Sequence, residues 1–284
     1  MNIAVIGAAG NMGRWFTNYF IKNGHKVKVY DRRRGAAKYL AEEVGAIYAP
    51  TLEQCVRGCD VIFLSIPVEI TPQILKKIEK SIESGSLLVE IASLKRDVVS
   101  ALKKLPKQIT PLSLHPLFGP GLSDLKFGRM IVVEVNDLKH ETELAKKLFP
   151  EAHFTGCGVD EHDKMIAYSL TLPYFLNLAF GLCISNLKTT KLRQYAGTTL
   201  SIQLDLLEAI IQSSRHLIPQ LLALNPYSDK VIKRYLEVTK TLHQHLKKRE
   251  GLAKILAKLE RKLTSDPDYQ KAYRNLYNLT EKKH

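Results

Sequence analysis

Residues 2–13 read NIAVIGAAGNMG, a short run of apolar and β-branched residues that leads into three glycines. The run predicts a strand, and the residues after it have the spacing of a helix over Arg14–Asn23. Glycines between a strand and a helix are typical of a phosphate-binding turn: Gly7 permits the tight turn, Gly10 lets the backbone approach a pyrophosphate, and Gly13 lets helix and strand pack closely. The unpaired N–H groups and positive dipole end of the helix then face the anion. We therefore predict a dinucleotide site at Gly7, Gly10, Asn11, Met12 and Gly13.

An acidic residue ends the second predicted strand, because KVKVYD closes at Asp31, 18 residues after Gly13. A carboxylate at this place accepts hydrogen bonds from the ribose hydroxyls of NAD and repels the 2′-phosphate of NADP. Three arginines follow at 32–34, and a guanidinium directly after the acid can stack on adenine or reach a 2′-phosphate. We predict NAD as the cofactor, contacted by Asp31 and Arg32, and leave NADP open.

The first 155 residues alternate short strand-like runs with segments of helical period. The runs are NIAVIG, KVKVYD, DVIFLSIP, SLLVEIA, ITPLSLH and RMIVVEV. Repeated βα units predict a Rossmann-type doubly wound parallel sheet with helices on both faces. Open sheets of this kind place ligands at the carboxyl ends of their strands, so Ser65 and Pro67, which end DVIFLSIP, are further predicted cofactor contacts.

After residue 160 the strand pattern stops, and helical stretches cover Glu161–Leu187 and Thr198–Leu224. We predict an α/β fold in two domains, a dinucleotide-binding domain over residues 1–157 and an all-helical substrate and dimerisation domain over residues 158–284. The segment YSLTLPYFLNLAFGLCI has apolar residues on more than one helical face. Because a thin helical layer cannot hide such a segment, we expect a homodimer interface there.

Composition excludes several classes of protein. The 284 residues suggest two domains at about 150 residues each. Hydrophobic residues at 45%, charged residues at 25% and a mean hydropathy of -0.12 are typical of an ordinary globular chain, with no apolar run near the roughly 18 residues of a membrane span. We therefore expect neither a membrane-spanning nor a disordered protein.

The net charge of +14 is concentrated towards the end of the chain, where residues 226–284 contain 15 Lys or Arg against 7 Asp or Glu. Leucines at helical spacing lie between these charges, which indicates an amphipathic helix with a solvated face rather than nucleic-acid binding. Four scattered cysteines are too few for a disulfide framework or a four-ligand metal site. With an N-terminus that looks like a strand rather than a signal peptide, we expect a cytoplasmic protein without a metal.

Two later loops leave strand ends and are expected to open onto the same crevice: EIASLK, which contains Ser93, and SLHPLFGP, which contains His115. Oxidation of an alcohol by hydride loss needs a group that takes the hydroxyl proton, and neutral imidazole titrates near working pH. His115 could instead be a packed core residue. Its position beside a predicted cofactor loop favours the role of general base.

Taken in order, the motifs resemble those of the prephenate dehydrogenase family, and its short archaeal form in particular. The resemblance rests on GAAGNMGRWF, the SIP turn, ASLK, HPLFGP and DEHDKM at the start of a long helix. HPLFGP after a dinucleotide domain is the most specific of these. The resemblance implies NAD(P)-dependent oxidative decarboxylation of prephenate to 4-hydroxyphenylpyruvate in tyrosine biosynthesis. By the family pattern, His115 takes the proton of the ring C4 hydroxyl, and Ser93 holds that hydroxyl in register.

Prephenate carries two carboxylates, and here the chain departs from the family. Relatives have histidine in a segment that reads SLTLPY here, and Ala209 lies near the place of the family's substrate-binding arginine. The predicted substrate contacts are therefore Ser93, Lys95, Thr171 and Tyr174. Further candidate cations are Lys126, Arg129 and Arg193. His162 begins the helix of DEHDKM, and we expect it to have a local structural role.

Three alternatives remain open from sequence alone. Arogenate dehydrogenase performs the same chemistry on a substrate with an amino group in place of the keto oxygen. A β-hydroxyacid dehydrogenase or imine reductase shares the two-domain plan but normally uses a lysine of the helical domain, and HPLFGP argues against it. An NAD(H)-binding regulator without turnover would explain the missing histidine and arginine.

Overall fold

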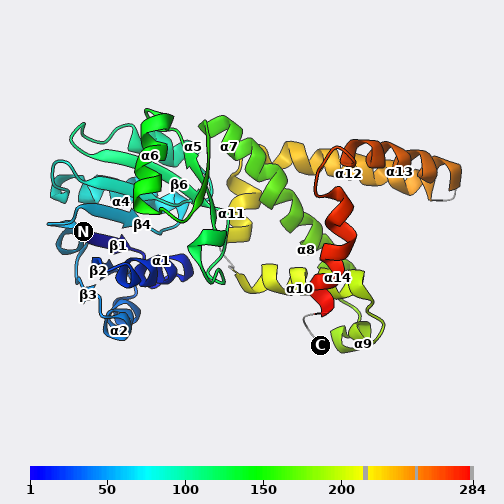
Figure 1. The fold of residues 1–284 in the computed structure, drawn as a ribbon, viewed down its shortest axis with the longest axis horizontal. Coiled ribbons are helices and arrows are strands. Elements are labelled where there is room, and N and C mark those ends of the chain that lie inside the picture. Colours follow the sequence, from blue (N-terminus) through cyan, green and yellow to red (C-terminus); the bar gives the residue numbers. More distant parts are fainter. Residues whose placement is uncertain (214–216, 247–248, 282–284) are drawn as a thin grey trace. The chain divides into compact units, whose positions relative to one another are not determined.

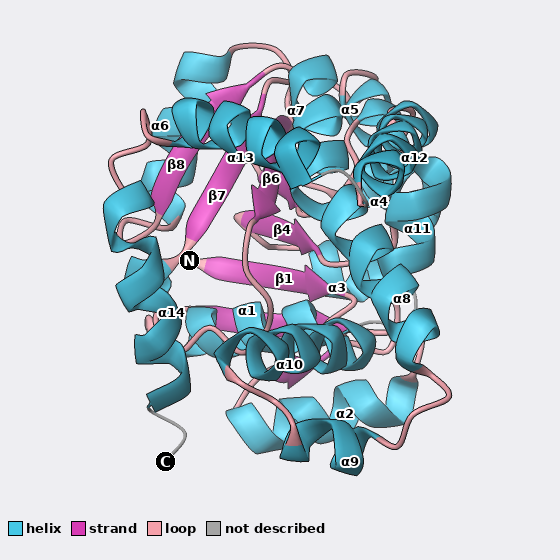
Figure 2. Ribbon diagram, turned by 90° about the vertical axis from the view of Figure 1, so that its right-hand side faces the viewer, coloured by secondary structure: helices cyan, strands magenta, loops and turns pink. Residues whose placement is uncertain are grey.

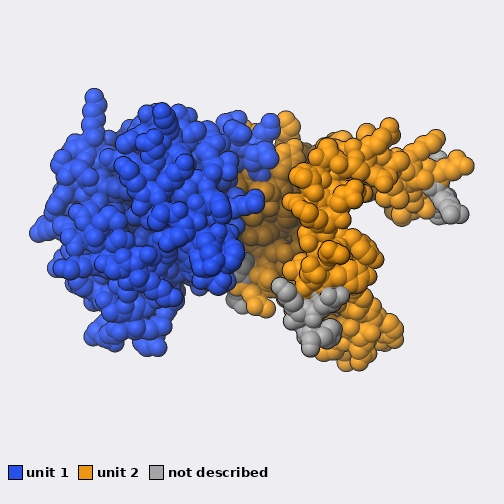
Figure 3. All heavy atoms as spheres, viewed as in Figure 1, with its two compact units in different colours: residues 1–165 blue, residues 166–284 orange. Residues whose placement is uncertain are grey.

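The computed structural model describes residues 1–213, 217–246 and 249–281, and the chain forms two compact units (Figures 1 and 3). Unit 1 comprises residues 1–165 and unit 2 comprises residues 166–284. The division lies a little after the predicted boundary at residue 157, because the first turns of the next helix carry His162 and Asp163, which bond to residues of unit 1. The short basic end predicted at residues 281–284 lies mostly outside the described residues.

Unit 1 is built on one eight-stranded sheet with the order β3-β2-β1-β4-β5-β6-β7-β8. Figure 2 shows β8, β7, β6, β4 and β1 in this sequence across the sheet. The strands are β1 (Asn2–Ile6), β2 (Lys26–Tyr30), β3 (Ile47–Tyr48), β4 (Val61–Leu64), β5 (Leu87–Glu90), β6 (Thr110–Pro116), β7 (Arg129–Val133) and β8 (His153–Cys157). The order, which reverses between β1 and β4, confirms the predicted Rossmann-type doubly wound fold.

The prediction of an all-parallel sheet was wrong at one pair, because β6 and β7 are antiparallel. A parallel pair needs a crossover connection, usually an α-helix, whereas the loop after β6 contains only a short 3₁₀ turn, Leu125–Phe127. Two strands were not predicted. β3 has two residues, and β8 reads HFTGC, which lacks a continuous apolar run.

Seven helices begin within the described part of unit 1. They are α1 (Asn11–Lys22), α2 (Arg34–Val44), α3 (Leu52–Val56), α4 (Thr71–Ile78), α5 (Arg96–Leu102), α6 (Leu138–Leu148) and α7 (Val159–Ile166). The first of these begins three residues before the predicted Arg14, because Gly10 is its N-cap. Asn11 and Met12 therefore belong to the first helical turn, where the unpaired backbone N–H groups lie.

Two apolar layers cover the faces of the sheet. One contains aromatic side chains from α1, β4 and the end of α6, and Phe16, Phe20, Phe63 and Phe149 are all 0% exposed. The other contains aliphatic side chains such as Ile62, and it packs β1 and β4 against α3, α4 and α5. Burial on both faces explains why these strands read as continuous apolar runs rather than alternating ones.

The loop between β6 and β7 is anchored on α1. The Trp15 Nε1–H donates to the Leu122 carbonyl oxygen at 2.8 Å, and the Trp15 ring lies 5.2 Å from that of Phe118. The HPLFGP loop, in which Phe118 lies, is thus held against the helix that begins at the glycine turn.

In the described residues of unit 2, all regular secondary structure is helical. Its helices are α8 (Leu172–Ile184), α9 (Thr189–Gln194), α10 (Thr198–Ser213), α11 (Leu217–Leu224), α12 (Ser228–His245), α13 (Arg249–Leu263) and α14 (Ala272–Glu281). A π-helical segment, Ala167–Thr171, joins α7 to α8. It ends two residues before Pro173, whose missing N–H and bulky ring disturb the regular helical bonding.

The combined helix Val159–Ile184 agrees closely with the predicted helical stretch Glu161–Leu187. Its most apolar window has a mean hydropathy of 1.4, and only 22% of that window is buried. By length and composition alone this helix could cross a membrane, which corrects the expectation that no segment approaches a span. Its exposed side chains include Leu182, with 76% exposure.

Candidate active site

The glycine turn after β1 accepts only glycine at two of its three positions. Gly7 has φ of 82°, and a Cβ added there would lie 2.2 Å from the Ser65 carbonyl oxygen. A Cβ at Gly13 would lie 2.1 Å from the Gly7 carbonyl oxygen. The Gly10 N–H donates to that same oxygen at 3.1 Å, which closes the turn at the start of α1. The turn is therefore a compact backbone cradle that points the helix N-terminus at a ligand.

Asp31 ties this turn to the end of β2. One carboxylate oxygen accepts from the Ala9 N–H at 3.1 Å, and the other accepts from the Arg33 N–H at 2.9 Å and the Arg33 Nε–H at 3.2 Å. The arginine that pairs with Asp31 is thus Arg33. Arg32 and Arg33 are both exposed, and the contact of Arg32 with a cofactor stays a prediction. Sequence spacing could not distinguish these neighbouring guanidiniums.

The end of β4 lies against the glycine turn, since the Ser65 N–H donates to the Ile6 carbonyl oxygen at 2.9 Å. Ser65 is half-buried and Pro67 is exposed. Both residues lie at the carboxyl edge where the sheet order reverses. Their contact with a cofactor stays a prediction.

His115 lies near the end of β6, is 3% exposed, and faces a second histidine. Its Nδ1 lies 2.9 Å from Nε2 of His162, which is on α7 and fully buried. Nδ1 of His162 lies 2.8 Å from Oδ1 of the neighbouring Asp163. His162, for which we expected a local structural role, thus also bonds to the predicted general base.

Asp163 is itself held by the loop after β5. The Lys95 N–H donates to its Oδ1 at 3.0 Å, and the Arg96 N–H donates to its Oδ2 at 3.2 Å. Both donors lie at the start of α5, so α7 is fastened to the loop that carries Ser93. Ser93 is half-buried in that loop, and its predicted contact with a substrate hydroxyl stays a prediction.

Lys95 was predicted to hold a substrate carboxylate, and its position argues against that role. The side chain is 0% exposed, and its Nζ donates to Glu90 Oε1 at 2.7 Å and to the Leu114 carbonyl oxygen at 2.6 Å. Glu90 also accepts from the Ser113 hydroxyl and from the Ala92 N–H. The ammonium group is therefore used to join β5 to β6 inside the fold.

Burial keeps both histidines neutral. Removal from water lowers the pKa of His115 well below its ordinary value of 6.5, and the neighbouring His162 and Lys95 lower it further. Burial also lowers the pKa of His162, although its hydrogen bond to Asp163 opposes that shift. For Lys95, burial lowers the pKa in spite of Glu90. A neutral imidazole is the form that can accept a proton.

The two substrate contacts predicted in unit 2 differ from each other. The Thr171 hydroxyl is fully buried and donates to the Leu221 carbonyl oxygen at 3.3 Å, so it is occupied within the unit. Tyr174 is half-buried, and burial raises the pKa of its phenol. Of the further cations, Arg193 pairs with Asp205 and Glu208, and Lys126 pairs with Asp124.

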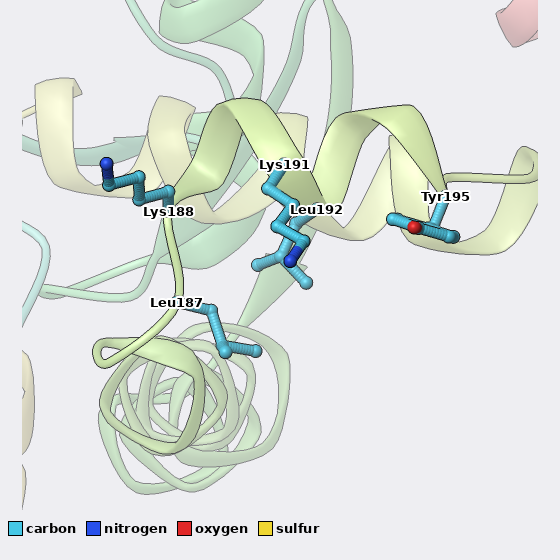
Figure 4. Close-up of a pocket in the computed structure, with 5 residues that line it drawn as sticks. All are labelled: Leu187, Lys188, Lys191, Leu192 and Tyr195. Carbon is cyan, nitrogen blue, oxygen red and sulfur yellow. The ribbon is translucent and has the colours of Figure 1, made fainter.

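A shallow depression lies elsewhere on unit 2. It is lined by Leu187, Lys188, Lys191, Leu192 and Tyr195 (Figure 4). The predicted site residues do not line it. Across residues 1–213, 217–246 and 249–281, no three His, Cys, Asp or Glu side chains cluster as metal ligands would.

The doubly wound sheet, the glycine cradle and the neutral histidine at a strand end define the fold and site of a dinucleotide-binding oxidoreductase. Residues 16–131 match the family described as "Prephenate dehydrogenase, nucleotide-binding domain". This match covers the nucleotide-binding part of the chain, which is similar in sequence to that of prephenate dehydrogenases.

Its curated relatives are distant and longer. The chain is 23% identical over 267 residues to the "Probable arogenate/prephenate dehydrogenase" of Methanocaldococcus jannaschii, which covers 90% of this chain and 59% of that protein. It is 24% identical over 186 residues to the T-protein of Haemophilus influenzae, covering 64% of this chain and 45% of that protein. The chain thus spans about half the length of these relatives.

Solved structures share the fold over more than nine-tenths of the chain. Prephenate dehydrogenase from A. aeolicus, in complex with hydroxyphenyl propionate and NAD+, superposes with a TM-score of 0.73 at 19% identity, covering 93% of this chain and 98% of that one. Synechocystis arogenate dehydrogenase gives 0.69 at 16% identity, with 94% and 99% covered. A 3-hydroxyisobutyrate dehydrogenase from Mycobacterium tuberculosis gives 0.53 at 14% identity, with 92% and 94% covered.

Proposed function

We propose that this chain is a prephenate dehydrogenase that catalyses the NAD(P)-dependent oxidative decarboxylation of prephenate to 4-hydroxyphenylpyruvate in tyrosine biosynthesis. The observation that carries the proposal is His115, a buried neutral imidazole at the end of β6 in the unit that matches the family. A base at this place is what removal of a substrate hydroxyl proton requires.

The residues of the glycine turn fit a dinucleotide. A Cβ at Gly7 or Gly13 would meet backbone oxygen, so the chain has kept the cradle free of side chains. Asn11 and Met12, in the first turn of α1, present backbone N–H groups to a pyrophosphate. Asp31, at the end of β2, would accept hydrogen bonds from the ribose hydroxyls, and we propose NAD as the preferred cofactor. When bound, the nicotinamide supplies the acceptor for the hydride from the substrate ring.

The chain's own residues handle the proton and the position of the substrate. His115 accepts the proton of the C4 hydroxyl, so that an O–H bond breaks and an N–H bond forms on the imidazole. The carboxylate on ring C1 leaves as carbon dioxide, and the ring becomes aromatic. Ser93 and Tyr174 orient the substrate by hydrogen bonds, whereas Lys95 and Thr171 have internal partners.

We further propose that the chain is a cytoplasmic homodimer that associates through unit 2. The support is the apolar helix Val159–Ile184, of whose most apolar window 22% is buried, together with exposed Leu182 and Leu206. A second copy would cover such side chains. Sedimentation in detergent-free buffer is expected to show a soluble dimer. A monomer, or a protein that needs detergent, would contradict this.

Arogenate is the second candidate substrate, because two relatives and one solved structure carry arogenate in their names. The test is the absorbance of reduced nicotinamide, measured with purified protein, NAD or NADP, and prephenate or arogenate. We expect reduction with prephenate and a higher kcat/KM with NAD. A higher kcat/KM with arogenate would reassign the substrate, and cofactor binding without turnover of either would contradict the proposed activity.

A further inference from the structure

Three side chains of unit 1 form a continuous hydrogen-bonded row that ends at His115. His115 Nδ1 bonds to His162 Nε2 at 2.9 Å, and His162 Nδ1 bonds to Asp163 Oδ1 at 2.8 Å. All three are nearly or fully buried, with exposures of 3%, 0% and 1%. Because β6 carries the first member and α7 the other two, the row exists only in the folded unit.

The chemistry of the groups sets the direction of these hydrogen bonds. The Asp163 carboxylate also receives the backbone N–H groups of Lys95 and Arg96, so it acts as an acceptor. His162 Nδ1 must then carry a hydrogen. In a neutral imidazole the other nitrogen, Nε2 of His162, has no hydrogen and accepts through its lone pair. That lone pair accepts a hydrogen bond from Nδ1 of His115, so Nδ1 of His115 carries the hydrogen. Nε2 of His115 is therefore unprotonated.

The surroundings keep both rings neutral, as this direction requires. Lys95, from the β5 loop, faces both histidines and disfavours their protonation, and Glu90 from β5 favours a charge on His162 only weakly. Burial lowers the pKa of both imidazoles. An imidazolium at His162 would reverse the bond to His115 and place a hydrogen on the wrong nitrogen.

We propose that His162 and Asp163 are positioning residues that hold His115 as its Nδ1–H tautomer and so present Nε2 to the substrate hydroxyl. This inference rests on the proposed function of His115 as the base. When His115 Nε2 takes the proton, the positive charge is stabilised by the hydrogen bond to His162 and, through that ring, by the carboxylate of Asp163. Neither positioning residue gains or loses a proton in the step.

The decisive measurement is the ¹⁵N spectrum of the histidine rings in the full chain at neutral pH, without substrate. His115 is expected to show a protonated Nδ1 and a bare Nε2. A protonated Nε2 in the wild-type protein overturns the proposal. Because this readout needs no turnover, it gives an answer even if the chain acts on neither prephenate nor arogenate.

Asp163→Asn provides the matched perturbation. Its amide can donate to His162 Nδ1, which reverses both hydrogen bonds and moves the hydrogen of His115 to Nε2. We expect kcat to fall by about 10²- to 10⁴-fold, as when a triad aspartate is replaced, with the Kd for NAD unchanged. Asp160→Asn, an exposed aspartate on the same helix, is expected to leave both the tautomer and kcat unchanged. An unaltered tautomer in Asp163→Asn overturns the proposal.

His162 supplies a second test that separates positioning from packing. The substitution His162→Gln keeps a hydrogen-bond acceptor for the His115 N–H. The substitution His162→Leu fills a similar space without an acceptor. We expect His162→Gln to retain at least about 10-fold more kcat than His162→Leu, with similar thermal unfolding. Equal kcat values in the two variants would assign His162 a packing role and overturn the proposal.

Discussion

Unit 1 and unit 2 differ in how they bury their apolar side chains. In unit 1, Phe16, Phe20 and Phe63 have no exposed surface, and even Lys95 is enclosed with its partner Glu90. In unit 2, Leu182 is 76% exposed and Leu256 is 66% exposed. Unit 1 therefore contains its own core and the proposed base, His115, whereas unit 2 presents apolar surface that a partner copy is proposed to cover. The following predictions test this contrast.

The largest expected difference is between a core phenylalanine and an exposed leucine. Phe63→Ala removes a ring packed against Phe16 and Phe20, and we expect the free energy of unfolding to fall by about 3–5 kcal/mol. Leu182→Ala is expected to change it by less than about 0.5 kcal/mol at dilute concentration while weakening self-association. Urea unfolding and sedimentation measure the two effects. Equal losses of stability would remove the contrast between the units.

The glycine cradle is the next most sensitive feature. Gly7→Ala places a Cβ 2.2 Å from a backbone oxygen at a positive φ, so we expect a loss of about 3 kcal/mol in unfolding free energy and loss of NAD binding. Gly35→Ala is the control, because no atom lies within 4 Å of its added Cβ and it lies in α2. It is expected to stabilise the protein by about 0.5 kcal/mol. Normal NAD binding by Gly7→Ala would contradict the assignment of the site.

The smallest effect is the pH dependence of unit 1. The folded pKa values of His115 and His162 lie below 6.5, so below this pH the unfolded chain binds more protons than the folded one. Stability is therefore full above about pH 6.5 and is lost as the pH falls, by up to about 1.4 kcal/mol per unit for each histidine. Urea unfolding of His162→Gln is expected to show a shallower slope between pH 5 and 6.5, with exposed His140→Gln as the control. Identical slopes in all three proteins would contradict the burial argument.

Local patterns predicted much of unit 1. The glycine turn, Asp31 at the end of β2, and His115 near the end of β6 follow from strand ends and motif spacing. The antiparallel β7 could have been expected, because the segment between His115 and Arg129 contains Gly119, Pro120 and Gly121, which disfavour a crossover helix.

Contacts between distant segments were not predictable in the same way. His162 lies 47 residues from His115, and nothing in the spacing brings α7 against β6. For Lys95 there was a local signal, since Glu90 lies five residues earlier in a buried run and a buried carboxylate needs a cation. Thr171 was predicted as a substrate contact because of its hydroxyl. That hydroxyl instead donates a hydrogen bond to the Leu221 carbonyl oxygen in α11.

The central claim is that His115 is the base of a prephenate dehydrogenase, and the most direct test compares the wild-type protein with His115→Asn. Reduction of nicotinamide with prephenate is expected in the wild type and is expected to fall by about 10²- to 10⁴-fold in the variant, with the same Kd for NAD. A variant with the wild-type kcat and the wild-type Kd for NAD would contradict the account.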